Sequence, residues 1–130
     1  MEPIRILVAD DNRLLLAITK DALAAQGFQV ITVGSGLDVY REVLAQRPHL
    51  ILLDIMMPEI DGIEICRNLK RNPATQKIVI VIHSAKRDLD LMDLAYEAGA
   101  EGFIMKSAQI ENMVGRIQEI VRDKIQPARD

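Results

Sequence analysis

The sequence has few of the residues that cross-link a small protein. Cys66 is its single cysteine, which excludes an internal disulfide and a metal cluster built from several thiolates. One unpaired cysteine suits a reducing compartment, and we expect Cys66 to be a partly buried free thiol on a helix. Aromatic residues make up only 3% of the chain, so each of them can be followed individually.

Long hydrophobic runs are also missing. The longest uninterrupted aliphatic runs, residues 14–18 and 78–82, contain five residues each, whereas a helix that spans a bilayer needs about 20. Met1 leads almost directly into a strand-like run, and no pattern of a secretory signal is visible. We therefore expect a cytoplasmic protein that makes no contact with the membrane.

The chain has no excess of basic residues. Its 16 lysines and arginines stand against 19 aspartates and glutamates, which gives a net charge of −3. Proteins that grip nucleic acid by their own charge are basic, so we expect no direct binding of nucleic acid, and a DNA-directed role would need another domain. With 130 residues, of which 49% are hydrophobic, the chain has the size and the apolar content of one domain.

Short aliphatic runs alternate with segments of helical spacing. Strands are predicted at 4–9, 28–33, 50–53, 78–82 and 102–105, with starts that lie 22 to 28 residues apart. Strands that alternate with helices pair in parallel through right-handed crossovers, which places helices on both faces of the sheet. We predict an α/β fold, a doubly wound three-layer (βα)5 sandwich around a five-stranded parallel sheet.

Capping residues support the predicted helices. Side chains that accept hydrogen bonds from free backbone N–H groups stand before the apolar-periodic stretches, and glycines follow the first and fourth helices, where a left-handed conformation ends a helix. The predicted N-terminal caps are Asn12, Ser35 with Asp38, Asp61 with Glu64, and Ser107, and the C-terminal glycines are Gly27 and Gly99.

Polar side chains follow four of the predicted strands. Asp10 and Asp11 follow the first strand, Asp54 the third, Ser84 the fourth and Lys106 the fifth. Ligands of open α/β sheets bind beyond the carboxyl ends of the strands, so we expect these groups to converge. Clustered carboxylates repel one another unless a cation neutralises them, and oxygen ligands of this kind favour Mg²⁺ together with a phosphoryl oxygen. The lysine and the hydroxyl supply the complementary half of an anion site.

A motif at residues 54–62, DIMMPEIDG, narrows the interpretation. With the acidic pair at 10–11, Ser84-Ala85 and Lys106, it resembles the receiver domain of two-component response regulators, from about residue 4 to residue 125. Blocks in the correct order make this resemblance specific. It implies a flavodoxin-like sheet of strand order 2-1-3-4-5, a receiver domain over residues 1–125, and a C-terminal tail or linker stub over 126–130.

The resemblance also implies roles for the site residues. Asp54 would be the phosphoacceptor, which takes a phosphoryl group from a sensor histidine kinase or a histidine phosphotransfer protein. Mg²⁺ would be held by Asp11 directly, by Asp10 through water, by Asp54 and by the backbone carbonyl of Met56. Lys106 would pair with the phosphoryl oxygens. Such a domain phosphorylates and dephosphorylates itself and is not a turnover enzyme.

The implied output is conformational. Ser84 would move inward to hydrogen-bond a phosphoryl oxygen, and Phe103, the switch aromatic, would turn in to fill the vacated space. The face of the fourth helix, fifth strand and fifth helix, near Tyr96, would then bind a downstream output domain or protein, or support a phosphorylation-dependent dimer of a monomeric protein. Leu14 and Leu16 are candidates for docking the phosphodonor, and a core role for at least one is equally open.

The chain departs from the receiver pattern after Lys106. Receivers usually have a proline there, joined by a cis peptide that aims the lysine, whereas this chain has Ser107. The bond is then either trans with a rearranged loop or cis and strained, and we predict that Lys106 still reaches the pocket while Ser107 caps the last helix. His83 is expected to be half-buried and to face away from Ser84.

Three other readings compete with the phosphorylated receiver. A haloacid-dehalogenase-like phosphatase would need a second aspartate where Met56 stands. A flavodoxin-like cofactor binder would need a phosphate loop where the acidic pair stands, and these acids repel phosphate. A degenerate receiver would bind partners without phosphorylation; Ser107 keeps this alternative open, while Lys106 and the acids oppose it.

Overall fold

The computed structural model describes residues 2–126, in which strands and helices alternate along the chain. The strands are β1 (Arg5–Ala9), β2 (Gln29–Val33), β3 (Leu50–Asp54), β4 (Val79–Ser84) and β5 (Gly102–Met105). The helices are α1 (Arg13–Ala24), α2 (Val39–Gln46), α3 (Gly62–Arg71), α4 (Leu89–Glu97) and α5 (Ile110–Ile120), which continues in a π-helical turn, Val121–Ile125. The predicted tail at 126–130 falls outside the described residues, apart from Gln126.

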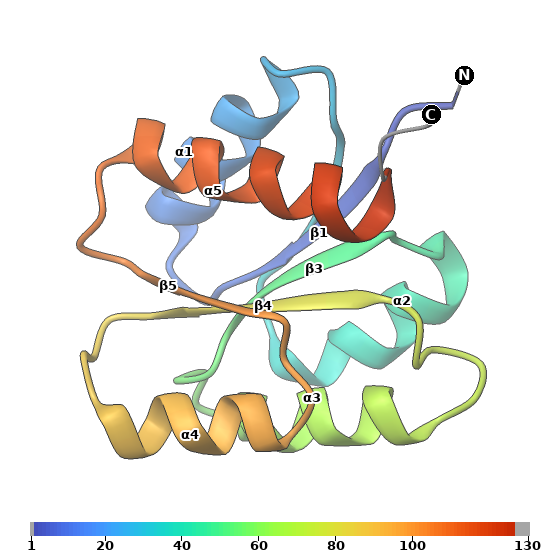
Figure 1. Cartoon of the computed structure of the whole chain (residues 1–130), viewed down its shortest axis with the longest axis vertical. Helices are drawn as coiled ribbons and strands as arrows, with labels where there is room; N and C mark the ends of the chain where they lie inside the picture. The colour runs from blue at the N-terminus through green and yellow to red at the C-terminus, as the bar shows by residue number, and fades with distance from the viewer. Residues whose placement is uncertain (1, 127–130) are drawn as a thin grey trace.

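The strands form one parallel sheet in the order β2-β1-β3-β4-β5, which confirms the predicted α/β sandwich. Figure 1 shows α1 and α5 on one face of the sheet and α2, α3 and α4 on the other. Alternate residues of β3 enter different cores, because successive side chains of a strand point to opposite faces. Leu50 and Leu52 pack in the α1/α5 layer, whereas Ile51 and Leu53 pack in the α2–α4 layer.

Burial follows the position of each strand in the sheet. The central strands β3 and β4 are buried at every residue, in keeping with their continuous aliphatic runs. The edge strand β2 is mostly exposed or half-buried, and β5 alternates between buried and half-buried residues. Strands buried on both faces therefore form the centre of the sheet, whereas its edges are partly exposed.

The caps agree with the sequence in part. The Asn12 side chain accepts a hydrogen bond from the N–H of Leu15, Asp61 caps α3, and Gly27 and Gly99 have positive φ. Ser35 caps a short 3-10 turn, Gly36–Asp38, that precedes α2. The prediction for Ser107 is wrong, because α5 begins at Ile110 after Gln109 and the side chain of Gln109 makes no capping bond.

A partly buried ion pair joins α3 to the starts of β4 and β5. Lys70 Nζ lies 2.8 Å from Glu101 Oε2 and donates to the carbonyl of Ile78 at 2.7 Å. The other carboxylate oxygen of Glu101 accepts from the N–H of Ile80. Cys66, one turn before Lys70, is fully buried rather than partly buried, and burial raises the pKa of its thiol to about 11. The thiol therefore stays protonated at neutral pH.

Gly62 allows α3 to start directly against the end of β3. A methyl group on Gly62 would collide with the Cα of Ile55 and would lie 2.8 Å from the carbonyl oxygen of Asp54, both of which are backbone atoms that cannot rotate away. We expect Gly62→Ala to lower the free energy of unfolding by about 2 kcal/mol or more, measured by urea denaturation.

Gly115 provides the matched control for this substitution. It lies within α5, and a methyl group there meets nothing within 4 Å. Gly115→Ala should therefore raise the stability by about 0.5–1 kcal/mol, because alanine restricts the unfolded chain and favours helix. Equal losses of stability in the two variants would contradict the close approach of α3 to β3.

Candidate functional site

Three of the predicted site residues meet at the carboxyl edge of the sheet. Asp10 follows β1, Asp54 ends β3 and Lys106 follows β5. The ammonium nitrogen of Lys106 lies 2.9 Å from Asp10 Oδ2 and 3.1 Å from Asp54 Oδ2. Both carboxylates are almost completely buried, with 2% of each residue exposed. Lys106 therefore bridges two buried acids that come from neighbouring strands.

Backbone N–H groups orient the two buried carboxylates. Asp10 Oδ1 accepts a hydrogen bond from the N–H of Asn12, and Asp54 Oδ1 accepts one from the N–H of Met56, each at 2.9 Å. Each acid thus holds the start of its own loop with one oxygen and Lys106 with the other. Each donating N–H belongs to the residue two positions after its acid in the sequence. Both hydrogen bonds are therefore local contacts that form where the chain turns after the strand.

The electrostatics of the site favour a bound cation. Burial raises the pKa of Asp54, and the nearby charge of Asp10 raises it further, against the opposing effects of the Met56 N–H and of Lys106. Burial also disfavours the charged form of Lys106, but its bonds to Asp10 and Asp54 prevail and raise its pKa. The carboxylates are therefore not fully compensated by one lysine.

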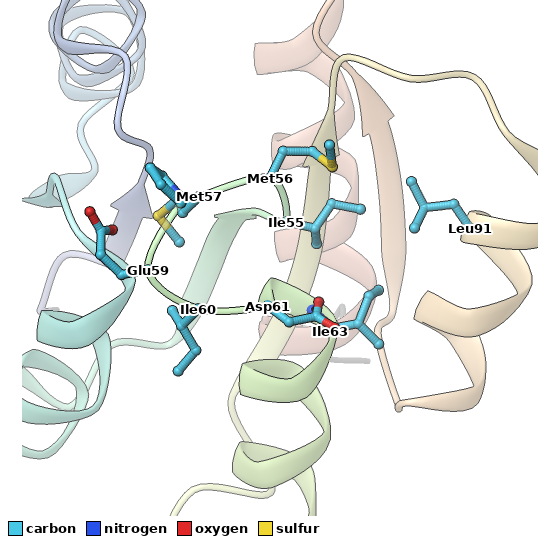
Figure 2. Close-up of a pocket in the computed structure, with 9 residues that line it drawn as sticks. Ile55, Met56, Met57, Glu59, Ile60, Asp61, Ile63 and Leu91 are labelled. Carbon is cyan, nitrogen blue, oxygen red and sulfur yellow. The ribbon is translucent and has the colours of Figure 1, made fainter.

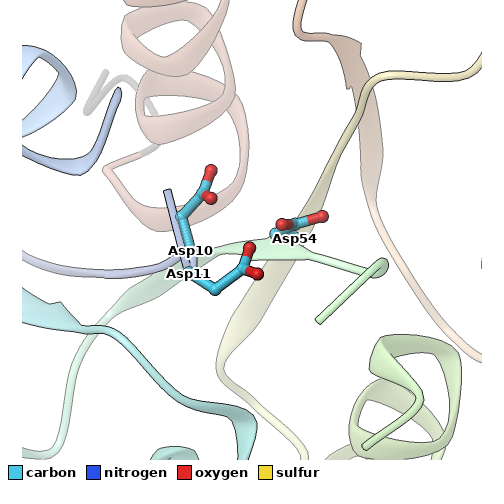
Figure 3. A group of neighbouring side chains, drawn as sticks. All are labelled: Asp10, Asp11 and Asp54. Atoms are coloured by element: carbon cyan, nitrogen blue, oxygen red, sulfur yellow. The ribbon is translucent and has the colours of Figure 1, made fainter. Parts of the chain in front are cut away.

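Asp11 adds a third carboxylate to the edge. Oxygens of Asp10, Asp11 and Asp54 lie within 4.8 Å of one another, and Figure 3 shows the three side chains gathered at the ends of β1 and β3. Asp11 is exposed, and within residues 2–126 no hydrogen bond or ion pair engages its carboxylate. A set of hard oxygen donors with one uncommitted carboxylate at the solvent side fits a divalent cation such as Mg²⁺.

Ser84 lies at the same edge but does not bond to the acids. Its hydroxyl is fully buried, accepts from the N–H of Lys86 at 3.1 Å and donates to the carbonyl of Lys86 at 3.2 Å. Strand alternation places Ser84 with Ile80 and Ile82, on the α2–α4 face, whereas Asp54 continues the α1/α5 face. The hydroxyl would have to leave its turn to reach a group bound at Asp54.

The family model described as the response regulator receiver domain matches residues 6–118. The chain belongs to the receiver domain family of response regulators. It is therefore a signalling domain of a two-component system, and the resemblance drawn from the sequence motifs is confirmed.

Curated relatives and solved structures agree with this assignment. The receiver is 36% identical over 118 residues to the DNA-binding response regulator MtrA of Mycolicibacterium paratuberculosis, a match that covers 91% of this chain and 51% of that protein. The chain thus spans about half the length of the curated relatives it matches.

Two solved structures show the same fold. A CheY-like receiver domain protein from Methanospirillum hungatei superposes with a TM-score of 0.88 at 22% identity, covering 95% of this chain and 97% of that one. The phosphorylated cyanobacterial phytochrome response regulator RcpA superposes with a TM-score of 0.82 at 26% identity, covering 98% of both chains. The flavodoxin-like architecture implied by the resemblance is confirmed.

The residues that the resemblance gives to the output switch and to phosphodonor docking differ in exposure. Phe103 is half-buried and packs against the α2–α4 core, and Tyr96 on α4 is 47% exposed. Leu14 on α1 is 72% exposed, whereas Leu16 packs against the α1/α5 core. Of the two candidates for donor docking, Leu14 therefore lies at the surface, whereas Leu16 is half-buried against the core.

The receiver also has a pocket beside the acidic edge. It measures about 540 Å³ and lies between the loop that follows β3 and Leu91 of α4 (Figure 2). Met56, Met57 and Ile60 give it an apolar lining, and the carboxylate of Asp61, also in the lining, caps α3 by accepting from the N–H of Ile63. Asp10, Asp11 and Asp54 do not line this pocket, but Met56, whose carbonyl the resemblance gives to the cation, does, so the pocket adjoins the candidate cation site.

His83 is more deeply buried than the sequence predicted. It is buried, with 5% exposed, rather than half-buried as expected, and it is the register partner of Asp54. Like Asp54 it continues the α1/α5 face of the sheet, as Val79 and Val81 do before it. The alternation of side chains along the strand predicts which face His83 occupies. Its position level with Asp54 depends on the pairing of β3 with β4.

Among residues 2–126, none of the helices is long and apolar enough to traverse a lipid bilayer.

The peptide bond between Lys106 and Ser107 is trans, since no peptide bond within the described residues is cis. Lys106 nevertheless reaches the acidic pocket, as predicted, while the residues after it form a turn in which the N–H of Ala108 bonds to the carbonyl of Met105. Of the two alternatives that the sequence left open for this bond, the trans peptide is therefore the one observed.

Proposed function

We propose that this receiver accepts a phosphoryl group on Asp54 from a phosphohistidine of a sensor kinase or of a phosphotransfer protein. The observation that carries the proposal is the bridge of Lys106 between Asp54 and Asp10, with the third carboxylate of Asp11 beside them. A buried carboxylate is a competent nucleophile toward phosphorus when cations neutralise the charge that accumulates there.

Mg²⁺ is the cofactor that this donor set fits. Asp11 would bind it directly, Asp10 through water, and Asp54 and the backbone carbonyl of Met56 would complete the protein's share. Asp10 already uses its oxygens for the N–H of Asn12 and for Lys106, whereas Asp11 is exposed to solvent, which supports this division. When bound, the metal supplies positive charge against the phosphoryl oxygens.

The transfer forms one bond and breaks one. A carboxylate oxygen of Asp54 forms a bond to phosphorus, the bond from phosphorus to the donor nitrogen breaks, and the donor imidazole keeps the electron pair. Lys106 exchanges its contact with Asp54 for the new phosphoryl oxygens, because these carry more negative charge than the carboxylate did. The product is an aspartyl phosphate on the receiver, so the domain is a phosphoacceptor and not a turnover enzyme.

The conformational output would follow from the new charge. We propose that Ser84 leaves its hydrogen bonds with Lys86 to donate to a phosphoryl oxygen, and that Phe103 turns inward. Phe103 is half-buried at the start of this movement, so it can gain contacts by moving in. The face of α4, β5 and α5 would then bind an output domain or protein, or a second copy of the receiver.

The proposed domain covers residues 1–125, and its output is supplied by another unit. The MtrA relative is named a DNA-binding response regulator and is about twice as long as the matched region, which supports an output domain in addition to the receiver. The receiver itself is acidic overall, with a net charge of −3, so direct contact with nucleic acid is assigned to such an output unit. We propose a monomer that dimerises, if at all, upon phosphorylation.

Incubation with acetyl phosphate tests the proposal. In the presence of Mg²⁺ the intact mass of the protein should increase by one phosphoryl group, and chelation of the metal with EDTA should abolish the increase. Phosphoramidate, which transfers the same group from nitrogen, serves as a second donor. A protein that binds Mg²⁺ but gains no mass from either donor would instead support a degenerate receiver that acts as a phosphorylation-independent interaction module.

A further inference from the structure

One strand of the sheet separates Lys106 from its carboxylate partners. Lys106 follows β5, while its partners Asp54 and Asp10 belong to β3 and β1, and β4 lies between β5 and β3. Neighbouring strands are about 4.8 Å apart, so β5 and β3 are separated by roughly 10 Å. The stem of Lys106 therefore has to cross over β4 to place its ammonium 3.1 Å from Asp54.

His83 lies on β4 at the level of Asp54, where this path ends. It pairs in register with Asp54 on one side and with Ile104 on the other. Leu52 of β3, Val81 of β4 and Ile104 of β5 are buried on the α1/α5 face. Because side chains alternate along each strand, the next residues on that face are Asp54, His83 and Lys106. The backbone N–H of Lys106 donates to the carbonyl of Ser84, so the pairing of β5 with β4 extends to Lys106.

The His83 ring is buried and uncharged, which suits it to pack against the side chain of Lys106. The ring is 95% buried, given an exposed fraction of 5%. Burial and, to a smaller extent, the charge of Lys106 lower the pKa of His83 to about 4 against the opposing effect of Asp10, so the ring is neutral at physiological pH. A neutral, flat ring offers an apolar surface on which the methylene stem of a lysine packs while its charged end reaches polar partners.

The usual device for aiming the lysine is absent from this chain. Ser107 replaces the proline that follows the lysine in most receivers, and the bond before it is trans. The direction of Lys106 therefore has to come from the side chains around it. His83 is a buried side chain of β4 that shares a sheet face with Asp54 and Lys106, beside Asp54 and two residues before the level that Lys106 reaches.

We propose that the imidazole of His83 is the platform across which the Lys106 stem lies, and that this platform holds the ammonium between Asp54 and Asp10. His83 is thus a positioning residue. Its consequence for phosphorylation rests on the function proposed above: without the ring, Lys106 would swing toward solvent and would meet the phosphoryl oxygens less often. The metal-binding acids, which are placed by β1 and β3, would keep their positions.

Competitive labelling of lysines tests this platform without any phosphoryl donor. The protein is treated with an amine-acetylating reagent, and the rate at each lysine is measured by peptide mass spectrometry. His83→Val keeps a strand-forming apolar residue but removes the ring, whereas His83→Phe keeps a flat ring of similar reach. Lys70, which is paired with Glu101 at 2.8 Å, is the internal control for intact folding.

We expect the labelling rate of Lys106 to rise by roughly fivefold or more in H83V, the size of change produced when one packing interaction is lost. H83F should stay near the wild-type rate, and Lys70 should react equally in all three proteins. Labelling is carried out at a temperature at which thermal unfolding shows each variant to be folded. A Lys106 rate that is unchanged in H83V, or one that is raised equally in H83F, would overturn the proposal.

The rate of phosphorylation provides a second measurement, which would not change in the expected way if His83 had only a structural role. At saturating Mg²⁺, H83V should take up the phosphoryl group from acetyl phosphate more slowly than H83F, while the Mg²⁺ concentration for half-maximal rate stays the same. A matched change in both quantities would contradict positioning through Lys106. If wild type gains no phosphoryl group at all, the proposed function fails, whereas the labelling result still decides whether His83 is the platform.

Discussion

The Asp54→Asn variant should gain no phosphoryl group from acetyl phosphate and Mg²⁺, under conditions in which wild type is modified. The amide has nearly the shape of the carboxylate, and its oxygen can still accept from the N–H of Met56, which lies 2.9 Å from Asp54 Oδ1. It lacks the charged oxygen that attacks phosphorus. Intact mass spectrometry after equal incubation measures this all-or-none effect.

Folding of the same variant provides its control. Because burial raises the pKa of Asp54 in the folded protein, its contribution to stability is present at low pH, below the pKa of the unfolded chain, and is lost as the pH rises through the folded pKa. Asparagine does not ionise, so Asp54→Asn should remove this loss and should be at least as stable as wild type at neutral pH without Mg²⁺. A phosphoryl adduct on the folded variant would place the acceptor elsewhere, and peptide mapping would locate it.

Acid should destabilise wild type through His83 by roughly 3 kcal/mol, the free energy that corresponds to a fall in pKa from 6.5 to about 4. The sign follows from the direction of the shift. A histidine whose folded pKa is lowered contributes stability above the pKa of the unfolded chain, and this contribution is lost as the pH falls from about 6.5 to about 4. Urea denaturation at a series of pH values across this window measures the effect.

His83→Phe provides the comparison for this prediction. The variant retains an aromatic ring but cannot take up a proton, so its free energy of unfolding should decrease less than that of wild type over the same range. Burial also lowers the pKa of His49, but His49 is present in both proteins and its contribution cancels in the difference. Parallel curves for wild type and H83F would show that His83 does not titrate in the folded protein as its burial requires.

The local features of the fold were predictable because they depend on local chemistry. Continuous aliphatic runs place β1, β3 and β4, and Asn12 and Asp61 cap the helices that follow their turns. The prediction for Ser107 is wrong for a related reason: the hydroxyl is a good cap in isolation, but the chain after Lys106 forms a turn first and starts α5 only at Ile110. The residue at which a helix begins after a turn depends on how the loop packs, and the type of one residue does not specify this.

The C-terminal end of α2 shows the same limit. Arg47 takes a left-handed conformation with φ of 50°, where the sequence has no glycine to signal the end of the helix. The side chain of Arg5, from β1, donates to the carbonyls of Gln46 and Arg47. A contact across more than 40 residues therefore helps to satisfy this helix end, and no local pattern predicts it.

By itself the sequence determined the alternation of strands and helices, the acids and the lysine at the strand ends, and the family to which they point, because periodicity, caps and strand-end residues are local properties of the chain. The tertiary structure decided which of these groups touch. It joined Lys106 to Asp10 and Asp54, left Ser84 bonded to Lys86, and set His83 level with Asp54. These outcomes depend on strand order, register and burial, which arise only when distant segments pack together.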